Sequence, residues 1–209
     1  MAGDQDSFSV RESLTAFLVS VIHTYLYQRG IYPRTVFTES VTLGVQVQVC
    51  KNPDVNDYIR DCISSLKPLL SDLCELRVVV NRPSRMDLCG KYLESLVLRF
   101  GHIGTEFSRR DVCSFALNEY FATVLLHLNL LECSRPPFTF ETSWEICVRM
   151  NSSSVNLNEA GIICWDCFEN QEHLQEDYSI LPIKSFRNNN VQLQVFLEES
   201  LKKDENDDS

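Results

Sequence analysis

The residues of this 209-residue chain that could carry metal or redox chemistry are its nine cysteines and four histidines. One cysteine pair has a ligand-like spacing: Cys164 and Cys167, which enclose Trp165 and Asp166. A structural zinc site needs four ligands, and the nearest histidine, His173, would supply only a third. The pair lies in β-rich sequence with acidic neighbours, unlike the helix-opening dithiol of a thioredoxin-like protein. The sequence therefore predicts no metal site and no cofactor.

The glycines and histidines do not point to catalysis either. None of the seven glycines falls in a dinucleotide-binding, P-loop or nucleophile-elbow spacing. The histidines at positions 23, 102, 127 and 173 are too far apart for the helix of a zinc protease. We therefore predict a protein that is not an enzyme. A redox or metal enzyme that uses Cys164 and Cys167 remains an alternative, testable by metal analysis.

The charge balance excludes further classes. The formal net charge is −10, and such a surface repels the phosphates of nucleic acids, so direct nucleic-acid binding is disfavoured. No apolar run reaches the roughly 20 residues that cross a bilayer, and residues 1–8 are polar and acidic, unlike a signal peptide. We expect a nuclear or cytosolic protein without membrane contact, whose cysteines are reduced and mostly buried.

Hydrophobic periodicity predicts an α+β domain in which helices cover one face of a mostly antiparallel sheet. Apolar residues at intervals of three and four predict helices over 10–26, 55–66 and 112–128, with Gly30 and Pro68 as stop signals for the first two. Alternating apolar and polar residues, or β-rich composition, predict strands. The predicted strands are 41–49, 76–81, 91–100, 138–150, 162–167 and 191–197, the second and third forming a hairpin.

Three aromatic residues stand out within these elements. In the last predicted strand, alternation turns Val195 and Leu197 inward and leaves Gln194 and Phe196 on the outer face. An outward phenylalanine is either accidental or an anchor for a partner. Trp165 has the same ambiguity. Tyr58 lies at the margin of the apolar stripe of its helix, where its ring can be buried while its hydroxyl meets water.

Two blocks of the sequence have an informative spacing. The first block comprises Tyr32-Pro33, Phe37, residues 53–61 (PDVNDYIRD) and residues 67–70 (KPLL). The second comprises Trp165, residues 180–184 (ILPIK) and residues 194–199 (QVFLEE). Both blocks resemble the HORMA domains of the accessory subunits of translesion DNA polymerase zeta. The resemblance covers about residues 10–200 and is weak from about 76 to 135.

The resemblance implies a HORMA fold: three helices packed on a mostly antiparallel sheet, with a C-terminal segment, the safety belt, that closes around a partner peptide. Residues 1–9 are then a disordered N-terminus, and residues 10–199 form the HORMA domain. The belt and the C-terminal strands occupy about residues 151–199. Residues 200–209 form an acidic disordered tail.

The resemblance also assigns binding residues. Tyr58 and Trp165 match aromatics that pack on proline-containing partner motifs, such as those of the catalytic subunit of polymerase zeta. Ile180, Gln194 and Phe196 match a surface that docks a Rev-one-like scaffold polymerase, in agreement with the outward face assigned to Gln194 and Phe196 by alternation. A basic residue of the family's third helix that contributes to self-association is replaced by Glu119, so self-association is left open.

These observations predict a non-catalytic adaptor that bridges the catalytic subunit of polymerase zeta to a Rev-one-like scaffold, in the nucleus and to some extent in the cytoplasm. Members of the family also act with shieldin-type proteins in double-strand-break repair and are linked to the mitotic checkpoint, and the sequence does not rank these roles. The closest alternative is a spindle-checkpoint HORMA protein of the mitotic-arrest-deficient type. The blocks around Tyr58 and Trp165 argue against that alternative.

Overall fold

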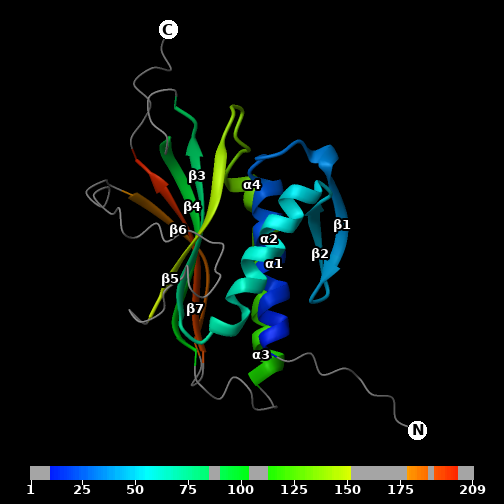
Figure 1. Cartoon of the computed structure of the whole chain (residues 1–209), viewed down its shortest axis with the longest axis vertical. Coiled ribbons are helices and arrows are strands. Elements are labelled where there is room, and N and C mark those ends of the chain that lie inside the picture. Colours follow the sequence, from blue (N-terminus) through cyan, green and yellow to red (C-terminus); the bar gives the residue numbers. More distant parts are fainter. Residues whose placement is uncertain (1–9, 85–89, 104–112, 152–177, 188–190, 202–209) are drawn as a thin grey trace.

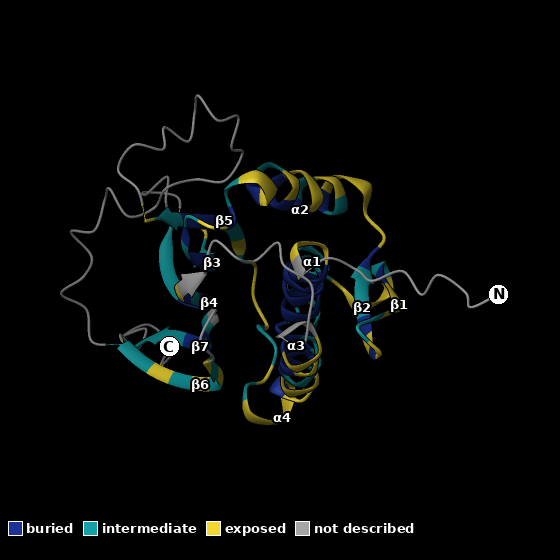
Figure 2. Ribbon diagram, turned by 90° about the horizontal axis from the view of Figure 1, so that it is seen from below, coloured by how far each residue is buried: buried dark blue, intermediate teal, exposed yellow. Residues whose placement is uncertain are grey.

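The computed structural model describes residues 10–84, 90–103, 113–151, 178–187 and 191–201. These residues form three layers, seen end-on in Figure 2. A five-stranded sheet forms the first layer, and the long helices α1 (Val10–Gln28) and α3 (Cys113–Asn129) form the second. A two-stranded hairpin covers the other side of the helices (Figure 1). The middle layer is therefore covered on both sides, which is why α1 is apolar around most of its circumference.

Helix α1 is the centre of the core. The apolar positions predicted from its periodicity are buried from Leu14 to Leu26, and the ring of Phe17 stacks on Phe121 of α3 at 4.1 Å between centroids. Gly30 ends the helix as predicted. It adopts a φ of 66°, and the N–H of Ile31 donates to the carbonyl of Leu26 at 3.1 Å. This six-to-one hydrogen bond is typical of a glycine-terminated helix.

The predicted strand 41–49 is wrong in one respect, because the chain reverses within it. The structure has two antiparallel strands, β1 (Phe37–Thr42) and β2 (Val45–Cys50). They are joined by Leu43 and Gly44, which have φ values of 52° and 76°. Two positive φ angles define the tight turn that matches the twist of a hairpin. The alternation of the sequence continues through this two-residue turn, and Gly44 was the overlooked signal.

Helix α2 (Pro53–Leu66) forms where it was predicted and begins with a side-chain cap. The side-chain oxygen of Asn52 accepts a hydrogen bond from the N–H of Asp54 at 3.0 Å, and Pro53 occupies the first turn, where its missing N–H costs nothing. The helix passes into a short 3-10 turn, η2 (Lys67–Leu69), at Pro68. A second 3-10 turn, η1 (Arg34–Val36), precedes β1.

The five-stranded sheet has the order β5-β3-β4-β7-β6, and every described pairing is antiparallel. Its strands are β3 (Leu73–Arg82), β4 (Lys91–Ile103), β5 (Ser143–Met150), β6 (Tyr178–Arg187) and β7 (Val191–Ser200). The predicted hairpin of β3 and β4 and the predicted final strand are confirmed. A short helix, α4 (Leu131–Ser134), follows α3 and was not predicted.

The strand predicted over 138–150 begins only at Ser143. The N–H of Phe138 donates to the carbonyl of Arg29 at 2.9 Å, which ties this part of the chain to the end of α1 and not to the sheet. The guanidinium of Arg29 also lies over the ring of Phe138, at 4.3 Å from its centroid. Alternation alone does not distinguish such an extended connection from a strand.

Strand β6 was not predicted from residue patterns. It carries Pro182, which cannot donate a ladder hydrogen bond and is tolerated because β6 is an edge strand. Leu181, Ile183 and Phe186 pack against the core, while Ile180, Pro182 and Ser185 are exposed. The predicted strand 162–167 lies outside the described residues.

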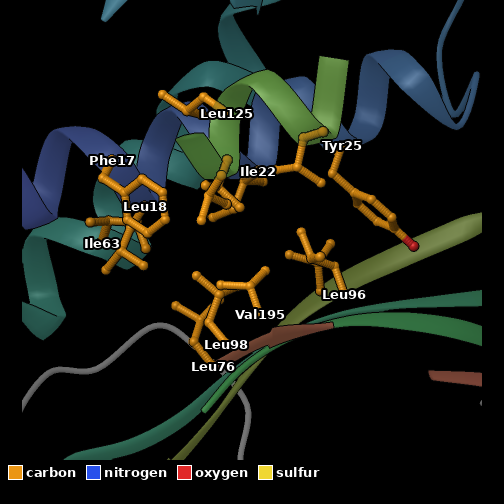
Figure 3. Close-up of a cluster of buried hydrophobic side chains, with 14 of the residues drawn as sticks. Phe17, Leu18, Ile22, Tyr25, Ile63, Leu76, Leu96, Leu98, Leu125 and Val195 are labelled. Carbon is orange, nitrogen blue, oxygen red and sulfur yellow. The ribbon is translucent and has the colours of Figure 1, made fainter. Parts of the chain in front are cut away.

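The core joins the helical layer to the sheet, as Figure 3 shows. Phe17, Leu18, Ile22 and Leu125 of α1 and α3 meet side chains of the sheet that are equally buried, namely Leu76, Leu96, Leu98 and Val195. Every one of these side chains has an exposed fraction of at most 1%. The helices therefore bury the centre of one face of the sheet.

The expectation of reduced cysteines is corrected at one position. Cys147 of β5 is disulfide-bonded, whereas Cys50, Cys62, Cys74 and Cys133 are free. Whether two cysteines can pair depends on their separation in space, about 4 to 7 Å between Cα atoms, which the sequence does not give.

Candidate functional site

Strand β5 lies at an edge of the five-stranded sheet. It pairs with β3 on its inner side, and no strand of the described segments pairs with its outer side. The N–H of Ile146 points to that outer side, since it donates to the hydroxyl oxygen of Tyr58 at 3.3 Å. In an antiparallel strand alternate residues direct their backbone groups the same way, so those of Trp144 and Val148 also face outward. Such an edge can accept another strand.

Helix α2 holds Tyr58 beside this edge, and Figure 2 shows the helix next to β5. Val55, Ile59 and Cys62 of the same helix are buried, and Tyr58 lies next to this stripe with its half-buried ring packed against the core. Its ring meets Trp144 edge to face, with 5.5 Å between centroids. The predicted position at the margin of the stripe is confirmed, and the hydroxyl meets β5.

A second contact extends this group of aromatic side chains. The indole N–H of Trp144 donates to the hydroxyl of Tyr32 at 2.9 Å. We call Tyr32, Tyr58 and Trp144 the aromatic cluster; all three are half-buried. Sequence reasoning selected Tyr58 but missed Trp144 as a site residue. Its signal was a tryptophan at the start of a strand, and only the fold brings it to α2.

The chemistry of this edge is that of binding. Outward N–H and C=O groups can form main-chain hydrogen bonds with an extended peptide, and aromatic faces can hold proline rings. Within the segments that the structure describes, no three His, Cys, Asp or Glu side chains are grouped so that they could hold a metal ion. None of the described helices is long and apolar enough to cross a membrane.

Trp165, the second residue predicted to bind a partner peptide, lies outside the described residues, as do Cys164, Cys167 and His173. The structure therefore places Tyr58 alone of the two predicted peptide-binding residues.

The three residues of the predicted scaffold surface lie together on the face of the sheet that the helices do not cover. Ile180 of β6 is opposite Glu198 of β7, and side chains two residues apart on a strand share a face, so Gln194 and Phe196 lie on the same face as Ile180. Ile180 is 62% exposed, and Gln194 is half-buried. The outward direction predicted for Gln194 and Phe196 is confirmed.

The expectation that Phe196 is an exposed aromatic is wrong, because its exposed fraction is 7%. It lies opposite Val97 of β4 and Pro182 of β6, and the guanidinium of Arg99 lies 5.1 Å from the centroid of its ring. Alternation fixes the face on which a side chain lies. It does not show how far neighbouring strands cover it.

Arg99 belongs to a group of charges on the same face, which we call the arginine cluster: Glu75, Arg77, Arg99 and Arg149. The carboxylate of Glu75 is fully buried and accepts hydrogen bonds from Arg77 at 2.6 Å, Arg99 at 2.7 Å and Arg149 at 3.2 Å. Burial by itself raises the pKa of Glu75, but the bonds from Arg99 and Arg77 outweigh it and the pKa is lowered. The carboxylate therefore stays ionised.

Glu119, which stands where the resembling proteins have a basic residue, lies on the exposed side of α3.

Comparisons with known proteins agree with this architecture. No protein-family model matches the chain. It is 23% identical over 201 residues to the mitotic spindle assembly checkpoint protein MAD2B of Danio rerio, covering 93% of this chain and 92% of that protein. The Homo sapiens protein of the same name is 23% identical over 199 residues. A DNA polymerase zeta processivity subunit of Arabidopsis thaliana is 31% identical over 77 residues, or 37% of this chain and 36% of that protein.

Solved structures show the same fold. A chain of the mitotic checkpoint complex matches with a TM-score of 0.71 at 16% identity, over 90% of this chain and 97% of that one. The C. elegans protein HTP-2, bound to the HTP-3 closure motif 1, matches with a TM-score of 0.63 at 14% identity, over 95% and 94%. The predicted α+β HORMA fold is confirmed, and so is the resemblance to HORMA accessory subunits.

Proposed function

We propose that this chain, which has the HORMA fold and is related to the MAD2B proteins, is a non-catalytic adaptor that captures an extended, proline-containing segment of a partner protein. The observation that carries the proposal is the outer edge of β5, where outward backbone groups lie beside Tyr58 and Trp144. Related support comes from the closure motif bound by HTP-2, a protein of the same fold.

Capture at this edge uses two kinds of contact. The peptide adds as a strand and forms main-chain hydrogen bonds with β5, which give affinity for any extended chain. Its prolines pack on the aromatic cluster, which gives selectivity. The predicted safety belt, at about residues 151–199, then closes over the bound segment, so that release requires local unfolding.

The partner that we propose for this edge is the catalytic subunit of polymerase zeta. Support comes from the name of the Arabidopsis thaliana relative and from the two blocks that resemble polymerase zeta accessory subunits. A Rev-one-like scaffold polymerase docks on the other predicted surface, formed by Ile180, Gln194 and Phe196. The protein then acts in the nucleus as a bridge in translesion synthesis, and shieldin-type repair proteins are further candidates for capture.

A checkpoint role is the second candidate. The relatives that match nearly the whole chain are named as spindle assembly checkpoint proteins. The same edge would then capture the peptide of a checkpoint partner, so competition between a polymerase zeta peptide and a checkpoint peptide for the full-length protein distinguishes the two roles.

The test is calorimetric titration of the full-length protein with a proline-containing peptide from the catalytic subunit of polymerase zeta. Tyr58→Ala and Trp144→Ala should each weaken binding by at least about 10-fold, because each removes an aromatic anchor. Phe115→Ala is the control, since Phe115 is a 70% exposed phenylalanine on α3. Equal affinities for the wild type and both variants would contradict the proposal.

Hydrogen exchange separates edge addition from a purely side-chain contact. Peptide binding should protect the amides of Trp144 and Val148, which face the open edge, more than those of Glu145 and Cys147, which already pair with β3. Uniform protection along β5, or none, would mean that the peptide does not add as a strand.

A further inference from the structure

We infer that Arg99 is a specificity-determining residue of the scaffold surface and that it binds a carboxylate of the docked protein. This inference deepens the proposed function. It rests on one part of that function, the docking of a Rev-one-like scaffold polymerase on Ile180, Gln194 and Phe196. Nothing in the sequence pattern or in the resemblance points to Arg99. It follows from the burial of Phe196 and from the way in which the arginine cluster holds this one guanidinium.

Arg99 is fixed on two sides. Its Nε donates to the buried carboxylate of Glu75 at 2.7 Å, and its guanidinium lies over the ring of Phe196. Glu75 is itself held by Arg77 at 2.6 Å, and Arg77 is held by Glu198 of β7 at 2.6 Å. The guanidinium plane is therefore oriented before any partner arrives, which reduces the entropy lost on binding.

The terminal nitrogens of Arg99 are available to a partner. Among the described residues, the hydrogen bond of this side chain to Glu75 uses Nε alone, and 43% of the side chain is exposed. Phe196 beneath it is 7% exposed. A protein that docks on this face therefore meets the guanidinium of Arg99 where an exposed aromatic ring was expected.

The chemistry of a half-anchored guanidinium selects its ligand. Two parallel N–H groups match the two oxygens of a carboxylate, which is the planar, bidentate pairing that arginine favours. Phosphate fits the same group, but the net charge of −10 disfavours a polyanionic nucleic acid. A single aspartate or glutamate on a protein surface can pair with Arg99. It is repelled much less by the net negative charge of the chain than a polyanion is, because salt screens charges at a distance.

The position of Arg99 places it on the same surface as the predicted scaffold residues. Arg99 is directly opposite Gln194, and Ile180 is opposite Glu198, four residues further along β7. The two side chains are then separated by roughly 13 Å along the strands and about 10 Å across them. One helix or hairpin of a partner spans this distance, with an apolar side chain on Ile180 and a carboxylate on Arg99.

The experiment measures binding of a purified Rev-one-like scaffold domain to the full-length protein at two salt concentrations. Arg99→Gln should weaken binding by at least about 10-fold at low salt and reduce the dependence on salt, because one desolvated charge pair is lost. Arg99→Lys should recover only part of the affinity, since an ammonium cannot pair in bidentate fashion. Arg34→Gln is the control: Arg34 is an exposed arginine in η1, paired with Glu132.

Capture of the polymerase zeta peptide is measured in parallel and should not change in Arg99→Gln. Scaffold affinity equal to that of Arg34→Gln would overturn the inference and leave the proposed function standing. A wild type that captures the peptide but does not bind the scaffold domain would overturn both scaffold docking and this inference. If Arg99→Gln lost binding to both partners, or changed self-association while scaffold binding stayed intact, Arg99 would act elsewhere. Either result would overturn the inference.

Discussion

The two faces of the five-stranded sheet differ in how far their charged side chains are exposed to solvent. The centre of the face toward α1 and α3 is apolar, and the ion pair of Glu94 in β4 with Arg29 at the end of α1 is buried there, with exposed side-chain fractions of 3% and 5%. A second pair on this face, Arg135 with Glu199 near the end of β7, is partly exposed. The other face carries the arginine cluster, in which Arg99 and Arg149 are 43% and 42% exposed. On the first face the ion pair of Arg29 and Glu94 is enclosed by protein. On the second, charge reaches the surface.

This difference separates stability from recognition. A buried ion pair contributes little net free energy when intact, but removal of one partner leaves an uncompensated charge in the core. Removal of a half-exposed arginine costs the protein little stability, because water replaces the contacts of the side chain. We therefore expect substitutions on the helix-covered face to unfold the protein and substitutions on the other face mainly to change binding.

The largest expected effect is that of Arg29→Met. The guanidinium of Arg29 donates two hydrogen bonds to Glu94, at 2.6 and 2.9 Å, and further bonds to the carbonyls of Arg135 and Pro136. Its removal leaves the Glu94 carboxylate buried with only the hydroxyl of Tyr25, which donates at 2.6 Å. The free energy of unfolding in urea should fall by about 3 to 5 kcal/mol.

The matched variant on the other face is Arg99→Met, which should cost about 1 kcal/mol or less, because Glu75 keeps Arg77 and Arg149. Replacement of both members of the buried pair, Arg29→Met with Glu94→Gln, should restore part of the loss. If Arg29→Met and Arg99→Met cost the same, the contrast between the two faces is wrong.

The second prediction concerns pH and the layer on the far side of α1. His23 is fully buried, and its Nδ1 accepts from the N–H of Cys50 in β2 at 3.3 Å. Burial, only partly offset by Asn56, lowers the pKa of His23 from 6.5 to about 4. The unfolded chain therefore binds more protons between pH 6.5 and 4, so stability is full above this window and is lost as the pH falls through it.

The size of this loss follows from the shift. Between pH 8 and pH 5, wild-type stability should fall by about 2 kcal/mol because of His23 alone. His23→Leu should remove this component of the pH dependence, although its absolute stability is lower. Urea unfolding of both proteins at the two pH values gives the difference, and parallel pH profiles would show that His23 is not the titrating group.

The third prediction concerns Phe196→Ala. Because the ring is 7% exposed and packs under Arg99, we expect a stability loss of about 2 kcal/mol, less than for a ring buried in a core. Phe196→Leu, which keeps apolar volume beneath the guanidinium, should cost under about 1 kcal/mol. A loss below about 0.5 kcal/mol for the alanine variant would mean that the ring is exposed in solution.

Much of the fold could be predicted from local patterns, because a helix or strand that packs against α1 or α3 has apolar residues at regular intervals in the sequence. The stripe of α2 and the pairing of β3 with β4 were predicted from such patterns. Features without a periodic record were missed, such as the edge strand β6 with its Pro182, and the extended segment before Ser143.

The candidate site was less predictable than the fold. Tyr32, Tyr58 and Trp144 come from a loop, a helix and a strand, and each is unremarkable in its own segment. The resemblance supplied Tyr58, while the outward direction of Gln194 and Phe196 came from alternation as well.

The sequence by itself determined which residues form helices, which face of β7 turns outward, and the HORMA resemblance, because these depend on neighbours within a few positions along the chain. Only the tertiary structure decided that Tyr58 meets the backbone of β5, that Cys147 is disulfide-bonded and that Arg99 covers Phe196. Arg99 and Phe196 lie on neighbouring strands that are far apart in sequence. The coverage of a side chain depends on such cross-strand neighbours, which the pairing of the sheet specifies and a local pattern does not.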